Sequence, residues 1–200
     1  MRVRRERQEL GAAYFAVSEA ITATAFCTFA LWVISPFALG TTRFHVVSAL
    51  TRFLVVVSAC QLCRVAAFSA TQLPSPAPHC AEGAAGATLP LPRSVADVLV
   101  VDVAKQVNRG CGDLIFSSHV TFVMAMALTY GRYGSRRVMK AANWGVVALN
   151  CVIIVASRKH YTVDVVVALF TVPLVWEAVA TRLHDPPRQT LQQQQQLLPR

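Results

Sequence analysis

Two histidines and one aspartate carry the chemistry that this sequence can do most readily. His160 and Asp164 are four residues apart, so on a helix they would lie on one face. A carboxylate in that position accepts a hydrogen bond from one imidazole nitrogen and leaves the other nitrogen free as a nucleophile or base. His119 follows Ser117, a residue type that caps helix N-termini, and such a terminus favours a bound phosphate. These residues predict a phosphoryl-transfer site.

Each histidine by itself has a simpler interpretation. A lone histidine in an apolar segment is often a packing residue whose hydrogen bond is satisfied. Two histidines and a carboxylate that share one membrane face are less easily explained by packing, because an ionisable residue within a span is a functional hypothesis by default. We therefore favour a catalytic role for His119, His160 and Asp164.

The elements that must position these residues are apolar segments. Of the 200 residues, 54% are hydrophobic and 14% are charged, against about 25% charged residues in an ordinary soluble domain. This composition excludes disorder for the bulk of the chain, and a lone soluble core of this size could not bury so much apolar surface. The 19 Lys and Arg against 10 Asp and Glu form no dense stripe, which argues against a nucleic-acid partner.

We predict an all-α, polytopic membrane helix bundle of about five spans. The expected segments are 20–42, 44–70, 114–130, 141–156 and 161–180. The chain would then consist of a basic N-terminal segment (1–19), a transmembrane catalytic domain (20–180) with a long loop (72–113), and a disordered polar tail (181–200) that contains a run of glutamines.

Basic residues in short loops predict the orientation. The loop 131–140 contains four basic residues and no acidic one, so we expect it in the cytosol: Arg132, Arg136, Arg137 and Lys140. The loop 72–113 and both histidine regions then share the exoplasmic face. Five spans would also leave the basic N-terminus on that face, which is against the rule.

Four further residues are candidates for binding a phosphate. Arg64 lies near the exoplasmic end of its segment, where it either binds a phosphodiester or snorkels to the interface. Arg158, two residues before His160, either neutralises developing phosphoryl charge or serves as an ordinary interfacial anchor. Ser117 and Ser118 lie at the predicted helix N-terminus that would receive the phosphate.

The six cysteines predict one disulfide and no metal site. Cys80 and Cys111 are the two that lie in or beside the loop 72–113, which faces an oxidising compartment, and we expect them to be linked. Cys60 and Cys63 form a C-x-x-C inside an apolar segment without a second pair, so core packing is favoured over zinc. The sequence has no nucleotide-binding glycine loop, and no cofactor is expected.

Three stretches of the sequence resemble the motifs of the sphingolipid synthases. They are Cys111-Gly-Asp-x-x-Phe-Ser-x-His119, His160-Tyr-Thr-x-Asp-Val, and the patch from Arg64 through Thr71-Gln-Leu-Pro-Ser-Pro. The resemblance covers residues 52–177 and keeps the family's order and spacing. This family includes the sphingomyelin synthases and the protozoan inositol phosphorylceramide synthases, and it is related to the lipid phosphate phosphatases, whose core the bundle would share.

The resemblance implies a head-group transferase that works without a metal on ceramide and a glycerophospholipid donor. The histidine matching His160, oriented by Asp164, would attack the phosphorus and release diacylglycerol. The histidine matching His119 would protonate that leaving group and then deprotonate the ceramide hydroxyl. The implied location is the Golgi or another endomembrane, with the site on the luminal face. A homo-oligomer is left open.

Two departures from the family pattern bear on activity. Ser118 stands where the family usually has glycine, which we expect to weaken rather than abolish the chemistry. The family has six spans, and the first has no counterpart here, so 20–39 would match its second span. The alternatives are therefore an inactive, N-terminally truncated member and a lipid phosphate phosphatase, although the phosphatases' usual Lys-x6-Arg-Pro motif is absent here.

The head group is left open by the sequence. Phosphoinositol, phosphocholine and phosphoethanolamine all require the same phosphoryl chemistry, and selectivity depends on the shape of the pocket. The run 158–165 looks closest to the protozoan branch of the family, which favours phosphoinositol.

Overall fold

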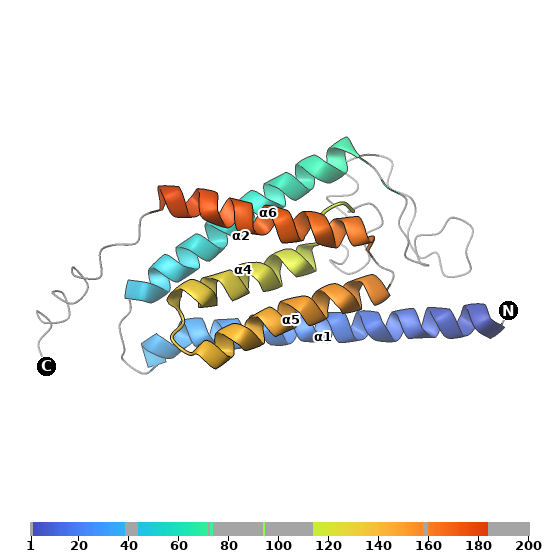
Figure 1. The fold of residues 1–200 in the computed structure, drawn as a ribbon, viewed down its shortest axis with the longest axis horizontal. Coiled ribbons are helices and arrows are strands. Elements are labelled where there is room, and N and C mark those ends of the chain that lie inside the picture. Colours follow the sequence, from blue (N-terminus) through green and yellow to red (C-terminus); the bar gives the residue numbers. More distant parts are fainter. Residues whose placement is uncertain are drawn as a thin grey trace, which may run out of the picture.

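The computed structural model describes residues 2–38, 44–71, 73, 94, 114–157 and 160–183. Within these residues the chain forms five helices and no strand, which confirms the all-α prediction. The helices are α1 (Arg2–Ala38), α2 (Phe44–Ala70), α4 (Ser118–Tyr133), α5 (Arg137–Ala156) and α6 (Thr162–Arg182). They lie along one another in a single bundle, and α4 contacts each of the other four (Figure 1).

Four of the described helices are long and apolar enough to cross a membrane. Their spanning parts are Ala16–Ser35, Val46–Ala70, Arg137–Ala156 and Thr162–Arg182. The third predicted segment (114–130) corresponds to α4, which has 16 residues where a bilayer requires roughly 20. This helix begins at Ser118 rather than at Leu114, because Ile115 (φ 78°) and Ser117 (φ −71°, ψ 114°) leave helical backbone angles. The chain is a multi-pass membrane protein with a short helix at its centre.

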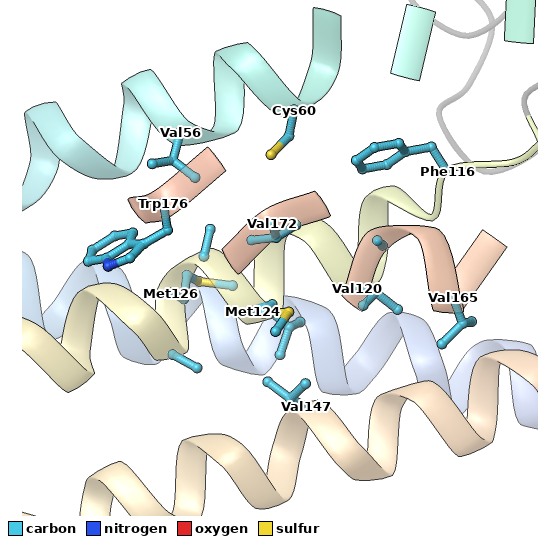
Figure 2. Close-up of a cluster of buried hydrophobic side chains, with 14 of the residues drawn as sticks. Val56, Cys60, Phe116, Val120, Met124, Met126, Val147, Val165, Val172 and Trp176 are labelled. Atoms are coloured by element: carbon cyan, nitrogen blue, oxygen red, sulfur yellow. The ribbon is translucent and has the colours of Figure 1, made fainter. Parts of the chain in front are cut away.

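The hydrophobic core surrounds α4. It combines apolar side chains of α2, α5 and α6 with an almost continuous buried run on α4, and Phe116 joins it from the segment before that helix (Figure 2). A helix that is apolar on all sides is typical of a fully buried position. Cys60 lies in this core with no exposed surface, as a packing residue would.

Helix α1 is held against the bundle by aromatic contacts and by the buried hydrogen bond between Ser18 and Asn150 of α5. The ring of Phe26 lies 5.2 Å from that of Phe122, and Trp32 lies 5.0 Å from Tyr130. The N-terminal part of α1 extends past the ends of α5 and α6 (Figure 1). The expected boundary between residues 19 and 20 falls inside this one continuous helix.

The two ends of the bundle carry different polar groups. Both histidine regions lie where α2 and α5 end and where α4 and α6 begin (Figure 1). At the opposite end, the buried Arg52 of α2 donates to the main-chain oxygen of Leu183 at 2.6 Å. Its guanidinium also lies 5.5 Å from the ring centroid of Trp176 and 5.9 Å from that of Tyr133. Arg52 thus joins α2 to the ends of α4 and α6.

Several expectations fall outside the described residues. They concern most of the loop 72–113, the tail from residue 184, the proposed phosphate contact of Arg158, and the disulfide between Cys80 and Cys111. These remain predictions.

Candidate active site

His160 and Asp164 form one of two histidine–carboxylate pairs at the site. The Nδ1 atom of His160 lies 3.0 Å from Oδ2 of Asp164, whose side chain has no exposed surface. The four-residue spacing brings them together, but His160 itself lies before α6, which begins only at Thr162. Tyr161 turns the chain into the helix with an extended conformation (φ −79°, ψ 158°). This contact orients the imidazole ring of His160 through Nδ1.

Asp164 also connects the two histidine motifs through main-chain groups. Its Oδ1 accepts a hydrogen bond from the N–H of Ile115 at 2.8 Å, and its Oδ2 accepts one from the N–H of Tyr161 at 3.0 Å. Its main-chain oxygen accepts the N–H of Ser117 at 3.2 Å. Both carboxylate oxygens are therefore engaged by hydrogen-bond donors.

His119 forms the second pair, with a residue that was not among the candidates drawn from the sequence. Its Nε2 lies 2.9 Å from Oε1 of Glu19 on α1, 100 residues earlier in the chain. The side chains are 11% and 28% exposed. The Nδ1 atom of His119 is buried and makes no hydrogen bond to any part of the chain that the structure describes. In the sequence, Glu19 stands out only as a carboxylate at the edge of an apolar segment. That position does not show which residue it pairs with.

A buried hydrogen bond places Glu19. The neighbouring Ser18 donates from its hydroxyl to Oδ1 of Asn150 on α5 at 3.2 Å. Both side chains are buried, with 2% and 0% of their surface exposed. Because a hydrogen bond requires a short distance and good alignment, this bond constrains the rotation of α1 about its own axis and its position along α5. In this position of α1, the side chain of Glu19 points towards His119.

The two pairs meet at one place in the bundle. The ring centroids of His119 and His160 are 6.3 Å apart, and the ring planes are inclined by 67°. Two imidazoles at this separation can act on one reacting group, with one as the nucleophile and the other as the general acid and base. In the described ranges, no group of three or more His, Cys, Asp and Glu side chains could hold a metal ion.

The other described candidates for phosphate binding are Ser117, Ser118 and Arg64, and their surroundings differ. Ser117 is fully buried and caps α4, since its Oγ accepts the N–H of Val120 at 3.5 Å. Ser118 is the first residue of α4 and is half-buried. Arg64 is half-buried on α2, and its Nη1 donates to Oε1 of Gln61 at 3.1 Å. Phosphate binding by these residues remains a proposal.

Comparison with known proteins finds similarity to enzymes that are named for the transfer of a lipid head group. Residues 110–181 match the family described as the PAP2 superfamily C-terminal domain. The chain is 43% identical over 182 residues to a phosphatidylinositol:ceramide inositolphosphotransferase of Oryza sativa, which is 91% of this chain and 56% of the relative. It is 42% identical over 182 residues to phosphatidylinositol:ceramide inositolphosphotransferase 2 of Arabidopsis thaliana, which is 91% of this chain and 59% of the relative.

A more limited similarity extends to an enzyme named for another head group. Phosphatidylcholine:ceramide cholinephosphotransferase 1 of Caenorhabditis elegans is 33% identical over 78 residues, which is 38% of this chain and 17% of the relative. No solved structure matches the chain significantly. The chain spans a little over half the length of the plant relatives, and the similarity covers the helices that carry both histidine–carboxylate pairs.

Proposed function

We propose that this chain, which belongs to the sphingolipid synthase family within the PAP2 superfamily, transfers phosphoinositol from phosphatidylinositol to ceramide. The observation that carries the proposal is the pair of imidazoles 6.3 Å apart, each held by a carboxylate. The choice of head group is supported by the names of the plant relatives, which share 42–43% of their residues with this chain over 182 positions.

In the first step, His160 is the nucleophile. Its Nδ1 is held by Asp164, so the lone pair on Nε2 attacks the phosphorus of phosphatidylinositol. The bond from phosphorus to the diacylglycerol oxygen breaks. That oxygen takes a proton from His119, and diacylglycerol leaves. Inositol phosphate remains bound to His160 through a phosphorus–nitrogen bond.

In the second step, ceramide is the acceptor. His119, now neutral, removes the proton from the primary hydroxyl of ceramide, and the oxygen attacks the phosphorus. The phosphorus–nitrogen bond breaks, its electron pair returns to Nε2 of His160, and His119 is again protonated. The same group therefore serves as acid in one step and as base in the other.

Glu19 supports His119 in this scheme. A carboxylate beside an imidazole orients the ring and stabilises its positive charge, as in other histidine–carboxylate pairs. Because Oε1 lies 2.9 Å from Nε2, the substrate oxygen must replace the carboxylate at this nitrogen when the proton is transferred. Glu19 thus keeps His119 in place between the two steps.

The proposed location follows from the two ends of the bundle. The end with the basic turn between α4 and α5 would face the cytosol, and the histidine end would face the lumen of the Golgi or another endomembrane. Ser117, Ser118 and Arg158 lie in or beside the histidine motifs in the sequence, and Arg64 lies in the last two turns of α2. These four residues are proposed to contact the anionic phosphate. A homo-oligomer is compatible with this arrangement.

The test is a transfer assay with three competing donors. Liposomes that contain the purified chain receive fluorescent ceramide with phosphatidylinositol, phosphatidylcholine or phosphatidylethanolamine. We expect labelled inositol phosphorylceramide with the first donor, and no product from the His119→Ala and His160→Ala variants. Equal transfer by wild type and both variants would refute the site.

Two other results would assign a different function. Release of phosphate from phosphatidate without ceramide would indicate a lipid phosphate phosphatase that uses water as the acceptor. Transfer of phosphocholine alone would retain the mechanism and overturn the head group. A wild-type chain that folds but neither transfers nor hydrolyses would indicate an inactive family member.

A further inference from the structure

Ile115 has a backbone conformation that its type of side chain avoids. Its φ is 78°, in the left-handed region, and it is the only described non-glycine residue there. For a β-branched residue such an angle is a genuine outlier, because Cβ approaches its own carbonyl oxygen. Such strain persists only where the surrounding structure imposes it, and it concentrates at active sites.

The residues on either side impose this conformation. Leu114 and Phe116 are 3% and 2% exposed, and the ring of Phe116 lies in the core cluster (Figure 2). Ser117 is held at two points, because its N–H donates to the main-chain oxygen of Asp164 and its hydroxyl caps α4. Because the residues on both sides are held in place, the change in chain direction between them occurs at the backbone angles of Ile115.

The turn directs the N–H of Ile115 at the carboxylate of Asp164. The distance from the amide nitrogen to Oδ1 is 2.8 Å, across 49 residues of sequence. The other oxygen, Oδ2, accepts from His160 and Tyr161. If Oδ1 had no partner, the carboxylate could rotate about its Cβ–Cγ bond. With donors on both oxygens its plane is fixed, and the direction of the His160 ring is fixed with it.

We propose that Ile115 is a positioning residue whose strained main chain holds Asp164, and through it His160, in line with His119. This inference rests on the proposed function, because the orientation matters only if His160 attacks a substrate. The active group is the amide N–H of Ile115 and not its side chain. The strain is the consequence of directing that N–H across to α6 while both neighbours stay packed.

The decisive variant removes this one donor. Replacing Ile115 by its α-hydroxy acid changes the amide into an ester and leaves the side chain in place. We expect kcat to fall by about tenfold to a hundredfold with KM unchanged, because a small misplacement of a reacting group costs that much. The matched control is the same ester at Leu183, whose N–H donates to Val179 at the other end of the bundle.

Two ordinary substitutions complete the test. Ile115→Gly keeps the N–H and adopts a positive φ without strain, so it is expected to retain kcat. Ile115→Pro removes the N–H and fixes φ near −65°, so it is expected to lose as much as the ester or more. An ester variant with wild-type kcat would overturn the proposal. So would Ile115→Gly losing activity while the ester retains it, since the side chain would then be the active group.

A substrate-free measurement separates this proposal from the proposed function. Diethyl pyrocarbonate modifies neutral imidazole nitrogens, and mass spectrometry locates the adduct. If the amide of Ile115 holds the site, the ester is expected to increase the rate of modification of His160 several-fold, because Nδ1 is less firmly held against Asp164. An unchanged rate would contradict the positioning role even if the chain transfers no head group.

Discussion

The two histidine–carboxylate pairs of this protein are built in different ways. His160 and Asp164 are four residues apart, and the carboxylate is fully buried with donors on both oxygens. His119 and Glu19 are 100 residues apart on different helices, and the carboxylate is 28% exposed. The first pair requires only that the start of α6 has folded, because both of its residues lie there. The second exists only when α1 has packed against α4 and α5.

This difference fits the two roles that we propose. A nucleophile must present one nitrogen in one direction to the phosphorus, which a buried and fully bonded carboxylate ensures. A general acid and base must exchange protons with two different hydroxyl groups in turn, so its carboxylate must be displaceable. The more open and less constrained pair is the one that must change partners.

The largest effect is expected for Asp164→Asn, which breaks the buried pair. An amide has one accepting and one donating end, so one of the two donor-facing positions becomes unfavourable in either orientation. We expect kcat to fall by about 10³–10⁴-fold, as when the carboxylate of a catalytic triad becomes an amide. Head-group transfer in liposomes measures this change. Glu177→Gln, an exposed carboxylate on the same helix, is the control and should retain activity.

A smaller loss is expected for Glu19→Gln, which removes the charge of the displaceable pair. Glutamine can keep a hydrogen bond to Nε2 of His119 but cannot stabilise an imidazolium as well. We expect kcat to fall by about a hundredfold, at the lower limit for a general acid or base contribution. The measurement is the single-turnover rate of diacylglycerol release. A loss as large as that of Asp164→Asn would mean that the two pairs are equivalent, and no loss would remove Glu19 from the site.

Asn150→Ala should have a weaker effect, because it acts on the second pair through the helix that carries Glu19. Without Asn150 the hydroxyl of Ser18 loses its partner, and α1 is free to shift relative to α5. We expect kcat to fall by about tenfold, less than the cost of a full ångström of misplacement. Asn143→Ala, a half-buried asparagine on the same helix, is the control. Ser18→Ala should match Asn150→Ala, and additive losses in the double variant would argue against a shared hydrogen bond.

Arg52→Met should leave both pairs intact and lower only stability. The variant loses the hydrogen bond to Leu183 and the contact with the ring of Trp176 at the opposite end of the bundle. We expect about 1.5–3 kcal/mol less stability, the usual value of a hydrogen bond from a charged group. Thermal unfolding in detergent measures this loss, and kcat per folded molecule should equal that of the wild type. A fall in kcat would show that the two ends are coupled.

The sequence predicted the fold class and three of the four residues in the two pairs, namely His119, His160 and Asp164. Apolar runs of sufficient length identify membrane helices because a bilayer allows few other spanning structures. The His160–Asp164 contact could be anticipated because four residues of chain allow few arrangements. The cap at Ser117 was also predicted, and α4 begins directly after it. The apolar segment from Leu114 was longer than the helix, since apolar composition does not show that Ile115 leaves helical angles while Leu114 and Phe116 are buried.

Other parts of the site depended on packing. Glu19 was visible as a carboxylate at the edge of an apolar segment, but its partner depends on the rotation of α1 and its height along the bundle. Ser117 was a candidate both for capping a helix and for binding phosphate, and in the folded chain its buried hydroxyl caps α4. The partner of Glu19 does not follow from spacing along the chain, whereas the capping role of Ser117 was predicted from its residue type and is confirmed.

The sequence by itself therefore determined an all-α, multi-pass membrane protein and the local pairing of His160 with Asp164. The tertiary structure decided that His119 meets Glu19, and that the amide of Ile115 holds Asp164. The physical reason is the range of the constraints. Hydrophobic length and i,i+4 spacing act within one segment, whereas contacts across 49 and 100 residues depend on how separately formed helices pack.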